Sequence, residues 1–374
     1  MTRSPFGRLR RLWLDVHLWI GAGLLVVLAP LSLSGAILVW REPLDRALHP
    51  ERFAVSGPEA ALPLSAYADA AGAAFAGRAA LAQLRLPQKA GDPVVATGRL
   101  SGPPDAGGRP RSLTVWLDPP TARVLGRADL SQSFSQVMHR LHGTLLIPQV
   151  GRKVVGWLGW AMFASCATGL WLWWPRGGGF LKALRWRRGS SKLFKLHHMV
   201  GFWICIPLAV LSLTGVYISF PQTARALFGL AEPRGGAPGG GAGRFAPPIP
   251  HPHLFIDRAG ALALRPGARL VSISVPVVGK APAWRLQVTT PDAEAPAAVQ
   301  VADADGAVKG GRSGQGGPDP LSRLMRRIHD GTDTGPAWRT VIALGGLAPT
   351  VLALSGVVMW LRRRARRNAL GGSA

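Results

Sequence analysis

Four long apolar runs, separated by polar segments, dominate the pattern of the chain. They lie at roughly 17–40, 154–174, 197–220 and 340–361. Each run is long enough to cross a bilayer as a helix, because a hydrocarbon core of about 30 Å needs about 20 apolar residues at the helical rise. The first run is too long for the core of a signal peptide and ends without a small-residue cleavage site. We therefore predict four transmembrane helices.

The two long segments between these runs, about 42–150 and 221–337, carry shorter patterns. The first contains a helical stretch, LPLSAYADAAGAAFAG, followed by the β-type stretches LAQLRLP, PVVATGRL and SLTVWLD. The second contains the β-type stretches ARLVSISVP, AWRLQVTT and AAVQVADADGAV, and a glycine-rich linker at 234–243. We expect each segment to fold as a small α+β module. Neither segment contains a P-loop, a dinucleotide fingerprint, a nucleophile–base set or a Cys/His metal spacing.

The chain also repeats itself. At an offset of 180 positions, VHLWIGAGLLVVLAPLSLSGAILVW aligns with LHHMVGFWICIPLAVLSLTGVYISF, and His17 meets His197. At an offset of 187 positions, His142 meets His329 and Thr168-Gly169 meets Ser355-Gly356. The fold class that we predict is therefore a membrane α-helical protein. Its four-helix transmembrane bundle is built from two parallel repeats related by an axis along the membrane normal, and it carries the two modules.

Basic residues predict the orientation of the bundle and its partner. The N-terminus, the link between the second and third runs, and the C-terminal tail are rich in Lys and Arg. The positive-inside rule makes these three segments cytoplasmic, which places both modules on the opposite side. The net charge of +25 raises the question of nucleic acid, but a nucleic-acid binder concentrates charge on a soluble face. Because much of the charge here flanks apolar runs, we expect membrane lipid and no nucleic acid as a partner.

These features together predict the domain boundaries. The N-terminus and first span occupy 1–41, the first module 42–130, an interfacial helix with the second span 131–175, a basic loop 176–196, the third span 197–220, the second module 221–320, an interfacial helix with the fourth span 321–361, and a basic tail 362–374.

Four of the nine histidines form two repeat-related pairs, His17 with His197 and His142 with His329. A two-fold axis along the membrane normal places equivalent residues at equal depth, so the two histidines of each pair can face each other across the axis. Two imidazoles can bind one metal from opposite sides in this way, and haem iron is the usual centre that takes such ligands. Zinc is a poorer candidate, because no pair has nearby Cys or acidic ligands to complete a tetrahedron. Small residues of the spans would leave room for a planar macrocycle; they are Gly21, Gly35, Gly201 and Gly215.

Several alternatives stay open at these positions. Any single histidine at a helix end is more often an interfacial residue that hydrogen-bonds a carbonyl. His198 is an alternative ligand to His197, and His139, one helical turn from His142, is an alternative ligand or a contact for a haem propionate. Arg140 and Arg327 could bind haem propionates or an anionic substrate, because a guanidinium group can form two hydrogen bonds to one carboxylate. Contact with a lipid phosphate is an equally good interpretation for both residues.

The position of the second pair requires a bend. His142 and His329 lie about three helical turns before their spans, so a straight helix would lift them roughly 16–18 Å out of the bilayer. The intervening stretches IPQVGR and GTDTGP contain helix breakers. We therefore predict that a short interfacial helix folds back over the bundle before each of these spans.

These motifs resemble the PepSY-associated transmembrane helix family. The resemblance is carried by HRLHGTLL at 139–146, TGLWLWWPR at 168–176, LHHMVG at 196–201, RRIHDGTDTG at 326–335 and SGVVMWLRRR at 355–364, and more weakly by the two modules. It covers nearly the whole chain.

The resemblance implies a function. Members of this family include di-haem reductases of ferric siderophores in the bacterial inner membrane, where a periplasmic Fe(III) chelate is reduced and released as Fe(II). Carried over to this chain, the resemblance implies two haem b groups whose axial ligands are His17, His197, His142 and His329. A quinol or a cytoplasmic reductant would donate the electrons, and no residue would act as an acid, base or nucleophile. The alternatives are a non-enzymatic PepSY scaffold or regulator, and a transporter.

Overall fold

A computed structural model describes residues 5–102, 110–174, 191–227, 229, 246–293, 296–310 and 320–371. Most of the predicted basic loop, the predicted linker at 234–243 and the last three residues of the predicted tail lie outside these ranges. The chain divides into two compact units. We call the unit drawn from 1–41, 137–228 and 321–374 the helical unit, and the unit drawn from 42–136 and 229–320 the sheet unit.

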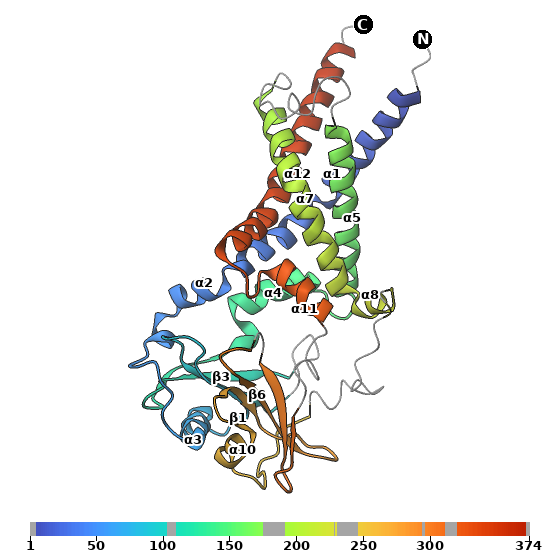
Figure 1. The fold of residues 1–374 in the computed structure, drawn as a ribbon. Helices are drawn as coiled ribbons and strands as arrows, with labels where there is room; N and C mark the ends of the chain where they lie inside the picture. The colour runs from blue at the N-terminus through green and yellow to red at the C-terminus, as the bar shows by residue number, and fades with distance from the viewer. Residues whose placement is uncertain are drawn as a thin grey trace. The chain divides into compact units, whose positions relative to one another are not determined.

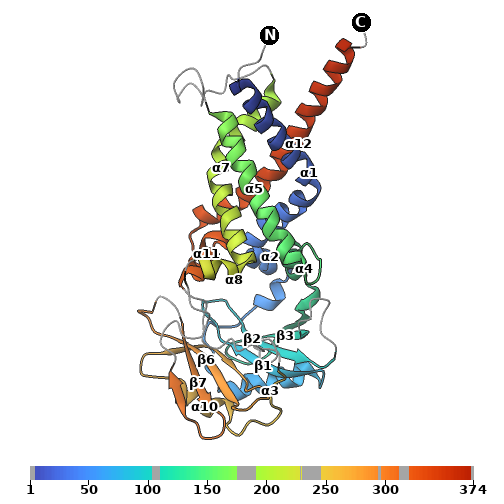
Figure 2. The same cartoon turned by 90° about the vertical axis from the view of Figure 1, so that its right-hand side faces the viewer.

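The helical unit contains four helices that are long and apolar enough to cross a membrane, and each coincides with one of the predicted spans. They are α1 (Pro5–Val39), α5 (Gly151–Trp173), α7 (Lys192–Ser219) and α12 (Pro336–Gly371). Helices α1 and α7 each pack against both α5 and α12, and Figures 1 and 2 show the four running side by side. Glycine permits close approach of α12 to α1, because a Cβ at Gly346 would lie 2.7 Å from the Ser32 carbonyl oxygen.

Four short helices directly precede or follow the long ones along the chain. They are α2 (Arg41–Leu48), α4 (Phe134–Thr144), α8 (Pro221–Leu227) and α11 (Pro320–Asp330). Helix α4 stops before α5, where Leu145, Leu146 and Gln149 have positive φ angles. Helix α11 stops before α12, where Gly331 and Asp333 have φ angles of 72° and 55°. The left-handed backbone ends both helices, so the predicted breaks before the second and fourth spans are confirmed.

The sheet unit contains one antiparallel sheet of eight strands in the order β4-β3-β2-β1-β5-β6-β7-β8. The strands are β1 (Ala79–Arg85), β2 (Val94–Leu100), β3 (Ser112–Leu117), β4 (Val124–Asp129), β5 (Arg269–Ser274), β6 (Ala283–Thr289), β7 (Ala297–Ala302) and β8 (Val308–Gly310). The remaining elements are α3 (Leu64–Phe75), α10 (Ile256–Ala263) and the 3-10 turns η1 (Pro50–Phe53) and η2 (Leu130–Gln132). The six predicted strands are all present.

The prediction of two separate modules differs from this arrangement. Residues Gln83–Arg85 of β1 pair antiparallel with Ser272–Ser274 of β5, so the four strands of each segment continue into one sheet. Each four-strand meander has one edge strand at this seam, and pairing the two edges satisfies backbone groups that would otherwise face water. The core joins the segments as well, since Leu84 of β1 and Ile273 of β5 are fully buried in one apolar cluster with residues of α3 and α10.

Candidate functional site

The structure brings the predicted histidines together in pairs within the helical unit. His17 of α1 lies beside His197 of α7, with ring centroids 6.5 Å apart and ring planes at 89°. His142 of α4 lies beside His329 of α11, with ring centroids 6.0 Å apart and planes at 41°. An imidazole nitrogen binds a metal ion at about 2 Å, so two rings on opposite sides of one ion have centroids roughly 6 Å apart. Both pairs have the spacing of two ligands on one metal.

The Nδ1 atoms of the His17/His197 pair are held by hydroxyl groups. His17 Nδ1 lies 3.0 Å from Thr168 Oγ1, and His197 Nδ1 lies 2.8 Å from Ser355 Oγ. Each hydroxyl already donates its single hydrogen to a backbone carbonyl of its own helix, Thr168 to Ala164 and Ser355 to Leu352. Each hydroxyl can therefore accept from an imidazole that is protonated on Nδ1, the tautomer that leaves the lone pair on Nε2.

Backbone carbonyls fix the same tautomer in the other pair. His142 Nδ1 donates to the Leu31 carbonyl at 2.8 Å, and His329 Nδ1 donates to the Leu211 carbonyl at 3.0 Å. Thr214 Oγ1 lies 3.0 Å from His329 Nδ1 as well. Metal-ligating histidines are oriented in this manner, with the non-ligating nitrogen hydrogen-bonded and the other free for the metal. In all four imidazoles, Nε2 is therefore the nitrogen that could bind a metal.

A glycine lies under each imidazole ring. A Cβ would stand 3.0 Å from His17 at Gly169, 2.7 Å from His142 at Gly35, 3.0 Å from His329 at Gly215 and 3.5 Å from His197 at Gly356, each time measured to ring Cε1. Each glycine follows a hydroxyl residue in the sequence: Ser34-Gly35, Thr168-Gly169, Thr214-Gly215 and Ser355-Gly356. We call these four dipeptides the imidazole seats. Each of the four long helices described above supplies one seat for a histidine of another helix.

Sequence reasoning missed this role. It assigned Gly35 and Gly215 to the space for a macrocycle, whereas the structure places imidazole rings on them. Of the other two glycines assigned to that space, Gly21 has no atom within 4 Å of an added Cβ, and Gly201 has only a Leu352 methyl carbon at 3.8 Å. The signal for this role is a Ser-Gly or Thr-Gly dipeptide in each of the four apolar runs. It is seen only when each glycine is considered together with the residue before it.

The second pair is neutral at pH 7. Burial lowers the pKa of His142, with its hydrogen bond to the Leu31 carbonyl opposing the shift. Burial, followed by the neighbouring His142, lowers the pKa of His329 to about 4. A neutral imidazole keeps the Nε2 lone pair that a metal requires. Within the described part of the chain, no three or more His, Cys, Asp or Glu side chains gather as metal ligands, so each pair offers two imidazoles and not a tetrahedral ligand set.

The second-rank residues lie in different surroundings. His198 stacks on Phe194 at 5.4 Å and on Trp173 at 5.7 Å, so it is part of an aromatic stack while His197 faces His17. His139 is exposed on α4, and Arg327 is exposed on α11. Arg140 differs, because its Nε atom is buried and has no hydrogen-bond partner among the described residues. A bound anion such as a carboxylate would satisfy it.

The helical unit is thus a bundle of four apolar helices with two pairs of facing histidines. Each pair is a candidate site for a metal that takes two protein ligands. The family model for the PepSY-associated TM region matches residues 14–363, nearly the whole chain. The chain therefore belongs to this family, which confirms the resemblance seen in its motifs. A search of curated proteins gives no match.

The hydroxyl of a seat is open to a direct test. Ser355→Ala removes the acceptor of the His197 Nδ1 proton and keeps the backbone and the glycine. We expect the affinity of the His17/His197 pair for haem to fall by about 10- to 100-fold, the usual cost of losing a partner that orients a ligand. The rate of haem loss to excess apomyoglobin measures this change. Thr340→Ala, which removes an exposed hydroxyl bonded to the Pro336 carbonyl of the same helix, is the control. Equal haem loss in both variants contradicts the assignment.

Proposed function

We propose that this chain is a haem-containing reductase of the bacterial inner membrane, with both termini in the cytoplasm. Electrons enter from quinol or a cytoplasmic reductant at the His17/His197 end of the bundle. They leave at the His142/His329 end toward a ferric chelate, such as a ferric siderophore, on the periplasmic side. The observation that carries this proposal is the presence of two imidazole pairs, each spaced for one metal and each fixed with Nε2 free.

The residues present fit two haem groups. His17 and His197 would hold one, and His142 and His329 the other. Bound haem supplies reversible one-electron chemistry whose potential depends on its axial ligands, hydrogen bonds and burial. Three features of the chain support this fit: the matched ring spacing, the glycines that seat the four imidazole rings, and the buried Arg140 Nε that an anionic group would satisfy.

The four spans set the distance between the pairs. His17 lies about four helical turns, or about 21 Å, from Leu31 on α1, where His142 is seated. His197 lies the same number of turns from Leu211 on α7, where His329 is seated. This separation covers most of a hydrocarbon core of about 30 Å. In this proposal the helices hold the two pairs at different depths of the membrane, and no residue acts as an acid or base.

The equivalent seats support the proposed duplication. Leu31 and Ser34-Gly35 seat His142, and Leu211 and Thr214-Gly215 seat His329, which preserves the offset of 180. The seats of His17 and His197 preserve the offset of 187. The two halves of the chain form the same contacts at equivalent positions. The simplest explanation is that both halves are copies of one ancestral unit. In this proposal each half also contributes four strands and one helix to the sheet unit.

The substrate step is a one-electron reduction. Fe(III) in the chelate accepts one electron and becomes Fe(II), while the donor on the other side loses one electron. Hard oxygen ligands hold Fe(III) much better than Fe(II), so reduction weakens the chelate and releases the iron.

Electron transfer across a sealed membrane tests the proposal. Proteoliposomes are loaded with dithionite, and ferric citrate with the Fe(II) indicator ferrozine is added outside. We expect coloured Fe(II) complex to form only in liposomes that contain the haem-loaded protein. Liposomes with haem-free protein are the control for leakage. Rates equal to this control would favour the alternative, a non-enzymatic scaffold.

A further inference from the structure

One face of the sheet in the sheet unit is packed, and the other carries a polar row. Helices α3 and α10 contribute to the apolar cluster on the packed face, together with Leu84, Ile273 and Leu286. Directly opposed residues of neighbouring strands share a face. The backbone pairing therefore aligns a second row on the other face: Gln83, Ser274, Arg285, Gln300 and Lys309. This row contains two cations, two amides, a hydroxyl and no acid.

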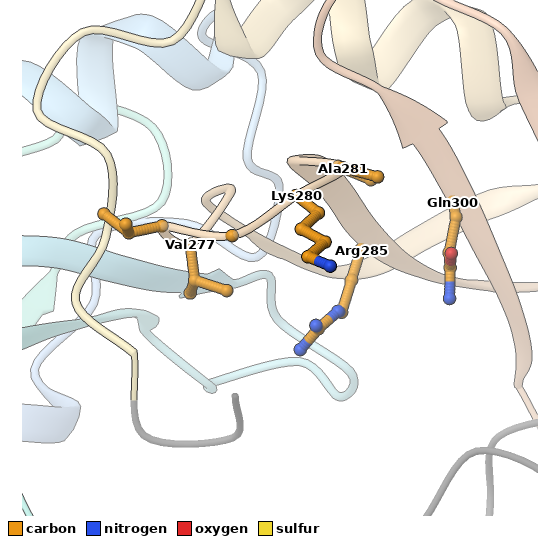
Figure 3. Close-up of a pocket in the computed structure, with 8 residues that line it drawn as sticks. Val277, Lys280, Ala281, Arg285 and Gln300 are labelled. Atoms are coloured by element: carbon orange, nitrogen blue, oxygen red, sulfur yellow. The ribbon is translucent and has the colours of Figure 1, made fainter. Parts of the chain in front are cut away.

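A shallow pocket of about 200 Å³ lies along this row. Its walls are the β5–β6 turn, which supplies Val277 and Lys280, and the strands β6 and β7, which supply Arg285 and Gln300. Figure 3 shows the side chains of Lys280, Arg285 and Gln300 projecting to the same side. The pocket therefore presents an ammonium, a guanidinium and an amide together.

The two cations of the pocket have no ion-pair partner among the residues that the structure describes. Neither Lys280 nor Arg285 has a carboxylate within ion-pair distance in the described ranges, although Arg46, Arg52 and Arg111 of the same unit do. No acidic residue lines the pocket. Two like charges that line one pocket repel one another, and this repulsion is relieved when an anion binds in the pocket. A guanidinium fork adds a directed pair of donors for a carboxylate.

We propose that this pocket binds a small polycarboxylate anion. The positive charge is distributed along the row, since Lys309 lies two strands from Arg285, about 10 Å at the spacing of neighbouring strands. A molecule with several carboxylates can reach separate cations, whereas a phosphate concentrates its charge within one tetrahedral group. Gln300 lies between the two and can bond a hydroxyl or carboxylate of the ligand. This inference is independent of the proposed reductase function, because it concerns binding alone.

Calorimetric titration of the detergent-solubilised full chain with iron-free citrate at low ionic strength tests the inference. We expect saturable binding at one site, weakened about tenfold by Arg285→Gln and about tenfold by Lys280→Gln, as befits the loss of one charge-assisted contact. Arg285→Lys keeps the charge but not the fork and should give an intermediate loss. Added salt should weaken the binding. The matched control is Arg258→Gln, which removes one exposed positive charge from α10 on the packed side of the sheet and should leave citrate binding unchanged.

Three results would overturn the assignment. The first is the absence of saturable citrate binding to the wild-type chain. The second is an equal loss in the Arg258 and Arg285 variants, which would indicate a general effect of net charge. The third is binding of inorganic phosphate, or of phosphatidylglycerol vesicles, with an affinity as high as that for citrate, which would assign the pocket to phosphate groups.

Discussion

His142→Ala is expected to remove one of two haems and to reduce Fe(III) reduction to background. The variant leaves His329 without the imidazole that faces it at 6.0 Å, so one axial ligand of the second pair is lost. The His17/His197 pair is about 21 Å away along the bundle and should keep its haem. The pyridine haemochrome assay should therefore give about half of the wild-type haem content, because one of two equivalent sites is lost.

The matched control is His139→Ala. His139 lies one turn earlier on the same helix and is exposed, so its removal should leave the haem content unchanged. If His139→Ala loses haem and His142→Ala does not, the ligand assignment between these two residues is reversed. If neither variant loses haem, the pair is structural and the reductase proposal fails.

Gly35→Ala is expected to weaken the same site without changing a histidine. The added Cβ would stand 2.7 Å from Cε1 and 2.9 Å from Nδ1 of His142, closer than carbon atoms pack. The ring cannot simply retreat, because its Nδ1 bond to the Leu31 carbonyl positions it on the same turn of α1. We expect the imidazole to leave its seat and the affinity of the His142/His329 pair for haem to fall at least tenfold, following the rule that misoriented ligands bind about 10- to 100-fold more weakly.

Gly21→Ala is the control for this variant. It makes the same chemical change on the same helix, at a position where nothing lies within 4 Å of the new Cβ. Alanine favours a helix over glycine by about 1 kcal/mol, so both variants should strengthen α1 and only Gly35→Ala should lose haem. The reduced-minus-oxidised spectrum and the thermal unfolding midpoint, measured together, separate the two effects. Haem retained at the wild-type level in Gly35→Ala would contradict the imidazole seat.

The elements that could be predicted from the sequence are those encoded by local patterns. The spans follow from run length, and strands such as Val94–Leu100 follow from β-type composition and flanking turns. The pairing of β1 with β5 could not be predicted in this way, because the two strands are far apart in the sequence and neither strand encodes its partner. Helix α10 was missed for a local reason, since its eight residues give too few turns for a periodic signal.

The same distinction holds for the candidate site: sequence patterns predicted its histidines, but they did not predict the contacts between helices that orient the rings. Repeat alignment selected the four histidines and ranked His197 above His198, and the structure places His197, not His198, beside His17. The contacts that orient the rings were not accessible, because a hydroxyl–glycine dipeptide has a meaning only when a second helix delivers an imidazole to it. Thr168 illustrates this point: it binds a histidine far away in the sequence, and no local pattern within its own helix reveals that contact.

The haem content of the wild-type chain tests the central claim most directly. The protein is purified in detergent after expression with haem supply, its fold is checked by circular dichroism, and haem b per chain is measured as the pyridine haemochrome. The account predicts two haems per chain, with a reduced-minus-oxidised spectrum typical of bis-histidine coordination. A folded, colourless protein that takes up no added haem would contradict it.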